Sequence, residues 1–172
     1  QESAVKELLQ QYDLEEQVSY EVEEIAKQNW NKYWESNFHP IAIGKDCYIR
    51  AHFHEPAPEY RYDLLITPKM SFGTGHHATT SQMVKHMLTI DHAGKSVFDI
   101  GAGTGILGIL ASKLGASTVD VCDIEDWSVE NAMENATANN VALHAFEGTA
   151  LKALPKTYDI LLANINRNVL LA

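Results

Sequence analysis

Hydrophobic and polar residues follow a regular order in the second half of the chain, from residue 95 onward. The stretches SVFDI, STVDVCDI, VALHAF and YDILLANI are short, apolar and rich in β-branched or aromatic residues, which predicts four strands. Between them, GILGILASKLG and DWSVENAMENATANN carry apolar residues at helical spacing. Gly115 is expected to end the first of these helices, and Asp126 to cap the second. Its predicted buried side holds Val129, Ala132, Met133 and Ala136. Strands that alternate with helices predict a parallel sheet covered on both faces.

The first half of the chain has shorter and more varied patterns. SAVKELLQQY has helical spacing, QVSYEVEEIA alternates like a strand at Val18, Tyr20 and Val22, and QNWNKYWESNF predicts a helix with Trp30 and Trp34 on one face. Short strands are then expected in IAIG, CYIRAHF and YDLLITP, with the loop HEPAPEYR before the last of them. TTSQMVKHMLTI predicts an amphipathic helix whose inward residues are Met83, Val84, Met87 and Leu88. His52 and His54 would share one face of a strand, but a metal there would need a third ligand.

Charge and composition narrow the class of protein. The 172 residues carry a formal net charge of −10, which argues against general binding to a nucleic acid backbone. Nine acidic and three basic side chains fall within residues 1–40. A partner surface for this segment would be basic, and the alternative is a solvated face without a partner. The chain has neither a long apolar span nor a signal-peptide pattern, and we expect a cytoplasmic protein with no membrane partner. Cys47 and Cys122 stand in apolar contexts that indicate reduced, buried thiols.

The stretch DIGAGTGILG follows a predicted strand and opens a predicted helix, the context in which a glycine motif holds a ligand. Two interpretations fit. Gly103, Gly105 and Gly108 with Asp123 match a dinucleotide fingerprint, whereas Asp99, Gly101, Gly103 and Gly105 match the glycine loop that holds S-adenosylmethionine in class I methyltransferases. The second frame starts where the strand stops, and we favour it for that reason. The alternative, in which these glycines serve only turns and packing, is disfavoured because glycine loses more conformational entropy on folding than other residues do.

An earlier stretch, PKMSFGTGHHATT, combines glycines, histidines and hydroxyl residues. A metal site is disfavoured because adjacent histidines rarely reach one ion, and a phosphate loop would need a lysine after Gly75. The stretch resembles the signature of the ribosomal protein L11 methyltransferase (PrmA) family. NWNKYWESNFHPIAIG, DIGAGTGILGILASKLGA, DIEDWSVENAMENA and LLANI resemble the same family in order and spacing, so the likeness covers roughly residues 18–172. His76 and Ala78 depart from the usual threonine and proline.

The resemblance implies an architecture. It predicts the end of a small α/β substrate-recognition domain in residues 1–26, a linker helix in 27–38 and a Rossmann-like catalytic domain in 39–172 that contains about the first four strands of the sheet. Because the fourth strand is followed by few residues, the catalytic sheet is expected to be truncated at its C-terminal side, and both ends of the chain to be shortened relative to the family.

The resemblance also implies the site residues. A lid over the methionine end of the cofactor would consist of Phe72, Gly73, Thr74, Gly75, His77 and Thr80. The glycine turn would contribute Asp99, Gly101, Ala102, Gly103, Thr104 and Gly105. Asp123 would bind the ribose hydroxyls, with Ile124 beside it, and Glu147 or the backbone of Gly148 and Thr149 would lie at the adenine. Catalysis is assigned to Phe72, facing the sulfonium, and to Asn164, which would orient the acceptor nitrogen; the alternative for Asn164 is a cap on the following helix.

The function expected from these residues is S-adenosylmethionine-dependent N-methylation of lysine or N-terminal amines of ribosomal protein L11. No metal, direct nucleic acid contact or membrane partner is expected, and a monomer is the working assumption. Two alternatives stay open from the residues alone: a nicotinamide-dependent dehydrogenase and a non-catalytic cofactor-binding module.

Overall fold

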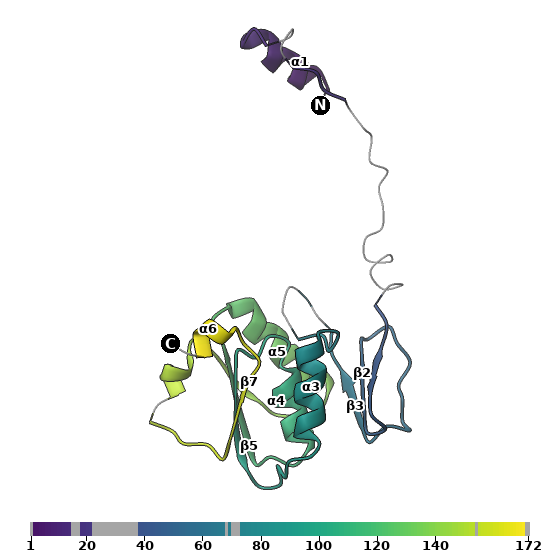
Figure 1. Cartoon of the computed structure of the whole chain (residues 1–172), viewed down its shortest axis with the longest axis vertical. Coiled ribbons are helices and arrows are strands. Elements are labelled where there is room, and N and C mark those ends of the chain that lie inside the picture. The colour runs from purple at the N-terminus through teal and green to yellow at the C-terminus, as the bar shows by residue number, and fades with distance from the viewer. Residues whose placement is uncertain are drawn as a thin grey trace. The chain divides into compact units, whose positions relative to one another are not determined.

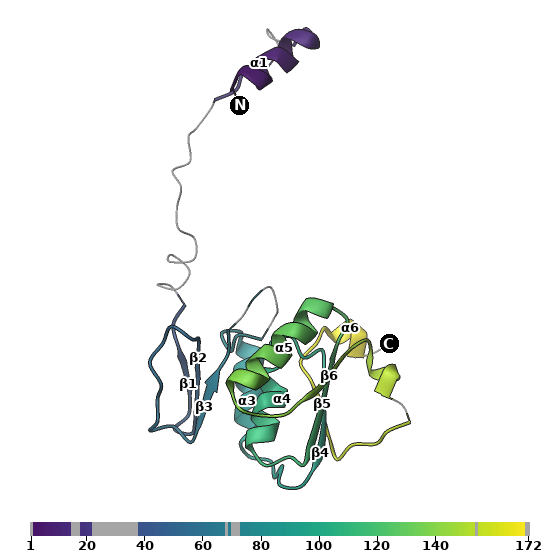
Figure 2. The ribbon, with the colours of Figure 1, turned by 180° about the vertical axis from the view of Figure 1, so that it is seen from behind.

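The computed structural model describes residues 2–14, 18–21, 38–67, 69, 73–153 and 155–170. The chain divides into two compact units, residues 1–37 and residues 38–172, and Figures 1 and 2 together label most of their elements. Most of the predicted linker helix, 27–38, lies outside the described residues, and only Phe38 is described. The domain boundaries proposed from the sequence therefore remain a prediction.

The described part of the first unit is dominated by helix α1, Glu2–Gln11. The helix ends where Asp13 takes a positive φ of 54°, with its N–H bonded to the Gln10 carbonyl and the Leu14 N–H bonded to the Leu9 carbonyl. This pair of bonds is a Schellman motif, which satisfies the last carbonyls of the helix. The predicted strand that starts at Val18 is wrong for residues 18–21, which form no strand. Alternation alone provides no partner strand, and none is described there.

The second unit begins with a three-stranded sheet in the order β1-β2-β3. Strand β1 (Ile41–Ile43) is antiparallel to β2 (Cys47–Arg50), and β2 is parallel to β3 (Tyr62–Leu65). One face of β2 and β3 is buried at alternate residues, as a period-2 pattern requires. Because β2 ends at Arg50, His52 and His54 lie in the turn that follows it, and the expectation that they share a strand face is wrong.

A four-stranded sheet carries the remaining strands in the order β6-β5-β4-β7. These are β4 (Ser96–Ile100), β5 (Thr118–Asp123), β6 (His144–Glu147) and β7 (Ile160–Ala163). Every neighbouring pair is parallel. This confirms the predicted parallel sheet and the Rossmann-like α/β fold class.

Three helices form a layer beside this sheet, with α4 (Ile106–Lys113) between α3 (Ala78–Met87) and α5 (Asp126–Ala138), as Figures 1 and 2 show. Residues 106–111 of α4 are all buried, because the helix packs on β4 and β5 and also contacts β3. The helix stops before Gly115, whose φ is 97°, as predicted. Helix α4 therefore joins the two sheets through one hydrophobic core.

Two local expectations need correction. Glu125, not Asp126, is the N-cap of α5, and Asp126 lies in the first turn. Among the described residues, no packed α-helix covers the second face of the four-stranded sheet: the connection from β6 to β7 makes only the short 3-10 helix η1 (Ala150–Ala153), and Tyr158 then stacks on Phe98 with 4.9 Å between ring centroids. The expected cover on both faces is thus only partly present.

Both cysteines lie in the interior of the second unit, as expected from their apolar sequence contexts. Cys47 and Cys122 are free and buried, and burial raises the pKa of the Cys47 thiol to about 12.

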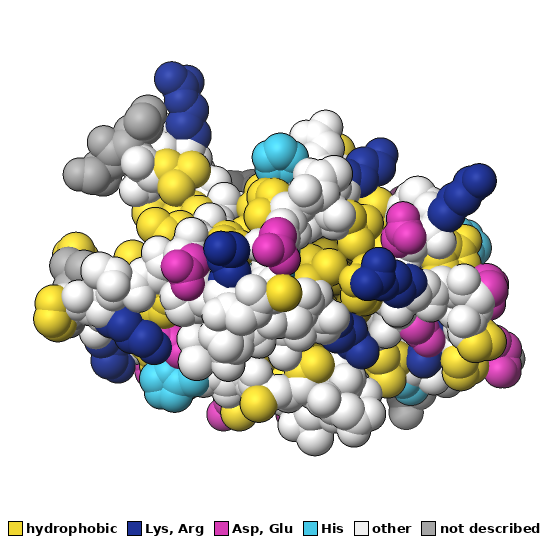
Figure 3. Space-filling view, turned by 90° about the horizontal axis from the view of Figure 1, so that it is seen from below, with side chains coloured by type: hydrophobic (Ala, Val, Ile, Leu, Met, Phe, Trp, Pro, Cys, Tyr) yellow, Lys and Arg dark blue, Asp and Glu magenta, His cyan; other side chains and the backbone are white. Residues whose placement is uncertain are grey.

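On the face drawn in Figure 3, acidic and basic side chains are interspersed among hydrophobic ones, so that face presents no broad region of one charge sign. Within the described residues, no helix has the length and apolar content needed to cross a membrane.

Candidate active site

A glycine turn closes strand β4 and starts helix α4. Gly101, Gly103 and Gly105 have φ angles of 71°, 54° and 77°, in the left-handed region that favours glycine. The N–H groups of Gly101 and Ala102 donate to the carbonyl of Cys122 at 2.8 and 2.9 Å, which ties the turn to the end of β5. A Cβ on Gly101 would overlap Ile165 Cγ2, so the chain after β7 packs directly on the turn.

Two carboxylates stand beside this turn in different environments. Asp99 is buried, and its Oδ2 accepts from the Gly108 N–H at 3.1 Å. Its Oδ1 has no hydrogen-bond partner among the described residues. Burial raises the pKa of Asp99 to about 7, against the lowering effect of the Gly108 bond and with a further contribution from Asp123. Asp123 is half-buried and accepts from the N–H of Gly103 at 2.9 Å and of Glu125 at 3.2 Å.

The histidine-rich segment lies against the glycine turn. Thr104 Oγ1 donates to the carbonyl of Gly73 at 2.6 Å, and Thr104 is fully buried. A Cβ on Gly73 would lie 2.8 Å from the same hydroxyl, so only glycine fits this contact. Two segments 31 residues apart are thereby brought together. Phe72, the lid residue expected at the sulfonium, lies outside the described residues.

The histidines of this segment have structural partners. His77 is the N-cap of α3, and its ring accepts from the Thr79 N–H. His76 contacts Thr74 Oγ1 at 3.2 Å and the His39 carbonyl at 2.9 Å. The capping role of His77 was not expected from the sequence, although its position directly before the helical pattern ATTSQM was a signal for it. The structure thus gives His77 a role in starting α3.

Asn164 lies just after β7 and faces the first turn of α3. Its Nδ2 donates to Thr80 Oγ1 at 3.2 Å, and Thr80 is fully buried. The cap of the following helix α6 (Arg167–Leu170) is instead Asn166, whose Oδ1 accepts from the Asn168 N–H at 2.9 Å. Asn164 also borders a cavity of about 590 Å³, which is lined by Thr79, Gln82, Met83, Lys85, His86 and Asn164.

The residues expected near an adenine lie at the ends of β5 and β6. Ile124 follows Asp123 and is 67% exposed. The Gly148 N–H donates to the Asp123 carbonyl at 2.7 Å, so the Gly148–Thr149 corner is fixed beside the end of β5. Sequence-predicted residues from the ends of all four strands and from the segment before α3 therefore gather at one edge of the sheet.

A parallel sheet of this order, with a glycine turn after one strand and a carboxylate at the end of the next, defines a Rossmann-like class I methyltransferase fold. The family model described as "Ribosomal protein L11 methyltransferase (PrmA)" matches residues 1–172. The chain belongs to the ribosomal protein L11 methyltransferase family.

Individual relatives agree with this assignment. The ribosomal protein L11 methyltransferase of Phocaeicola vulgatus is 44% identical over 99% of this chain and 62% of its own length, and that of Porphyromonas gingivalis is 48% identical over 83% and 50%. A crystal structure of ribosomal protein L11 methylase from Lactobacillus delbrueckii subsp. bulgaricus superposes with a TM-score of 0.66 at 28% identity, and covers 78% of this chain and 70% of that one. The chain spans half to about three fifths of the length of these two curated relatives.

Proposed function

We propose that this chain binds S-adenosylmethionine at the carboxyl edge of β4 and β5 and serves N-methylation of ribosomal protein L11. Membership of the family supports the reaction class. The observation that carries the site is the buried bond from Thr104 Oγ1 to the Gly73 carbonyl, because it joins the expected lid segment to the glycine turn. Relatives that carry the name of this activity are longer than the chain, so the activity and the substrate are proposals for it.

The residues present suit such a cofactor. Asp99 Oδ1 is a buried acceptor without a partner among the described residues, and it suits a cationic amino group. Turn residues Gly101, Ala102, Gly103, Thr104 and Gly105 allow close approach of a ligand to the backbone. Asp123 can accept from ribose hydroxyls, and the exposed Ile124 offers an apolar surface to a flat base, with Thr149 beside it. The proposed lid consists of Phe72, Gly73, Thr74, Gly75, His77 and Thr80.

Bound S-adenosylmethionine would supply a methyl carbon already activated by a sulfonium. The protein then has to position a neutral amine and to exclude water. A lysine amine has a reference pKa of about 10.4, so desolvation must favour its neutral form near pH 7. Thr80 engages the Nδ2 of Asn164, which leaves the Asn164 Oδ1 to accept from the amine. We assign lysine side chains and the N-terminal amine as acceptors, with Phe72 beside the sulfonium.

Equilibrium binding tests this proposal directly. Calorimetry on the purified protein should show saturable binding of S-adenosylhomocysteine and none of NAD at the same concentration. The Asp123→Asn variant should bind about tenfold more weakly, because a charged acceptor for hydroxyl groups becomes a neutral one. Transfer of a radiolabelled methyl group to purified ribosomal protein L11 then tests the reaction. Preferential binding of NAD, or failure to bind either S-adenosylhomocysteine or NAD, would reject the proposal.

A further inference from the structure

Three buried asparagines lie on one side of helix α5. Asn131, Asn135 and Asn139 are spaced four residues apart and are 1%, 3% and 6% exposed. Asparagine is disfavoured in helix interiors, and a buried polar side chain must find hydrogen-bond partners. We call these three residues the asparagine ladder.

The ladder pairs with the edge of β3 that faces away from β2. On the β2 side, the N–H groups of Tyr62 and Ile66 donate to the carbonyls of Asp46 and Arg50. Backbone groups of Leu65, Thr67 and Lys69, alternate residues of the chain, face the ladder instead. A strand edge of this kind otherwise presents unpaired backbone groups.

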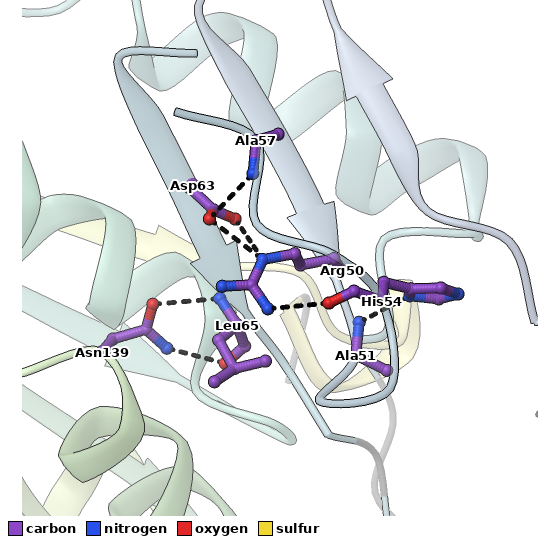
Figure 4. A network of polar contacts seen from close by, with 7 residues as sticks. All are labelled: Arg50, Ala51, His54, Ala57, Asp63, Leu65 and Asn139. Carbon is purple, nitrogen blue, oxygen red and sulfur yellow. Dashed lines mark hydrogen bonds and ion pairs between the residues drawn. The ribbon is translucent and has the colours of Figure 1, made fainter. Parts of the chain in front are cut away.

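Each rung uses the side-chain amide as a peptide group would be used in a sheet. Asn139 accepts from the Leu65 N–H at 3.0 Å and donates to the Leu65 carbonyl at 2.7 Å, the closed pair drawn in Figure 4. Asn135 accepts from the Thr67 N–H at 3.0 Å. Asn131 donates to the Thr67 carbonyl at 3.0 Å and accepts from the Lys69 N–H at 3.4 Å.

The match follows from helix and strand geometry. Four helical residues rise about 6.0 Å, and two strand residues advance about 6.6 Å. Asparagines spaced four residues apart therefore lie close to alternate backbone amides of the strand, which runs antiparallel to the helix. The mismatch between the two spacings grows by roughly 0.6 Å with each rung. The longest contact, 3.4 Å at Lys69, is in the last rung.

Asn135 differs from the other two because it also reaches the glycine turn. Its Nδ2 donates to the Thr104 carbonyl at 2.9 Å, in a buried bond. Thr104 in turn holds the Gly73 carbonyl through its hydroxyl. One side chain thus connects α5, the chain after β3 and the turn after β4.

We infer that the asparagine ladder sets the position of the lid segment and the glycine turn, and that Asn135 is a positioning residue for the cofactor site. The inference rests on the proposed function for its ligand, although the ladder itself does not depend on the ligand. Asn135 touches neither the cofactor nor the reacting atoms in this assignment. It acts by fixing Thr67 and Thr104 at once.

Two matched alanine variants separate positioning from stability. Asn135→Ala, within α5, and Asn139→Ala, at the C-cap of α5, each remove one rung of the ladder, but only Asn135→Ala removes the bond to Thr104. Both should lower the urea midpoint of unfolding. Only Asn135→Ala should weaken S-adenosylhomocysteine binding, by about tenfold, as expected for the loss of one buried hydrogen bond. Equal weakening by both variants would overturn the positioning role.

Amide hydrogen exchange of the unliganded protein gives a second readout. In Asn135→Ala, the amides of Gly103 and Gly105 should exchange faster, whereas in Asn139→Ala the increase should be confined to Leu65. If the alanine variant fails to fold, Asn135→Asp keeps an acceptor for the Thr67 N–H and still removes the donor to Thr104. Should the native protein bind no S-adenosylhomocysteine, the proposed function fails, and the exchange pattern alone decides on the ladder: unchanged protection at Gly103 and Gly105 refutes it.

Discussion

Asp99 is a buried carboxyl group whose charge changes near neutral pH. Burial raises its pKa to about 7, so the native state keeps the proton up to neutral pH, whereas the unfolded chain loses it near pH 4. Between these values the native state binds more protons, and the free energy of unfolding must fall as pH rises through this window. Above about pH 7 both states are ionised, and the contribution no longer changes.

Replacing Asp99 with asparagine should remove this pH dependence. The variant should gain free energy of unfolding relative to the native protein as pH rises from 5 to 8, by roughly 2–4 kcal/mol. Urea unfolding at several pH values measures the difference, and a difference that stays constant with pH would contradict a raised pKa.

Asp120→Asn is the control with the opposite sign. Burial alone would raise the pKa of Asp120, but hydrogen bonds from Lys156 and Tyr158 and the charges of Lys156 and His144 lower it overall. Its carboxylate therefore contributes stability above about pH 4, which is lost as pH falls through the lowered pKa. Relative to the native protein, Asp120→Asn should therefore lose free energy of unfolding as pH rises through the lowered pKa, the opposite of the trend expected for Asp99→Asn.

Gly101 is constrained by its neighbour as well as by its backbone angle. Gly94 has the same φ of 71°, but a Cβ on it would meet nothing within 4 Å, whereas one on Gly101 would overlap Ile165 Cγ2. Gly94→Ala should cost about 1 kcal/mol from backbone strain alone. Gly101→Ala should cost at least about 1 kcal/mol more, since the side chains must also separate.

Thermal or urea unfolding of the two variants measures that difference. Ile165→Ala placed in the Gly101→Ala background should remove the excess cost of that substitution, whereas Ile165→Ala in the Gly94→Ala background should leave the cost of Gly94→Ala unchanged. Equal costs for the two glycines would show that Ile165 does not pack on the turn.

At the scale of elements, hydrophobic periodicity and the glycines that end helices and strands predicted most helices and strands of the four-stranded sheet region. Strands β4 and β5 and helix α4 lie where SVFDI, STVDVCDI and GILGILASK indicate, because apolar runs ended by glycine leave few alternatives. The strand expected from Val18 is wrong for residues 18–21, since a strand also needs a partner that local sequence does not specify.

Helix α5 shows the limit of the hydrophobic pattern. Ala132 and Ala136 are buried as predicted, but Met133 is 42% exposed, and Asn131 and Asn135 are buried beside the two alanines. Periodicity assigns asparagines to the outside because it counts polarity and not backbone partners. The unpaired edge of β3, about 65 residues away in sequence, is what places them inside.

The site was predictable where glycines require a conformation and unpredictable where partners come from afar. Gly101, Gly103 and Gly105 were expected at the turn, and each has a positive φ. The bond from Thr104 to Gly73 could not be read from spacing, because it depends on how two loops meet in three dimensions. Their roles toward a cofactor remain predictions.

At the scale of the whole molecule, charge is unevenly divided between the two units. Residues 1–40 carry nine acidic and three basic side chains, so they hold −6 of the net charge of −10. Glu15, Glu16, Glu23 and Glu24 within them lie outside the described residues. The protein substrate proposed for this family member would meet such a segment through a basic face. Attraction of this kind is long-ranged and falls with added salt.

Replacing those four glutamates with glutamine should therefore weaken binding to ribosomal protein L11 at low salt and should flatten its dependence on salt. A matched variant neutralises four exposed acids of the second unit instead, Asp46, Glu55, Glu59 and Glu130, with the same change in net charge. Affinities of both variants, measured by calorimetry from 50 to 300 mM salt, separate a local surface from an overall charge effect. If the two variants lose affinity equally, net charge alone explains the binding; if neither does, the acidic segment makes no electrostatic contact with the substrate.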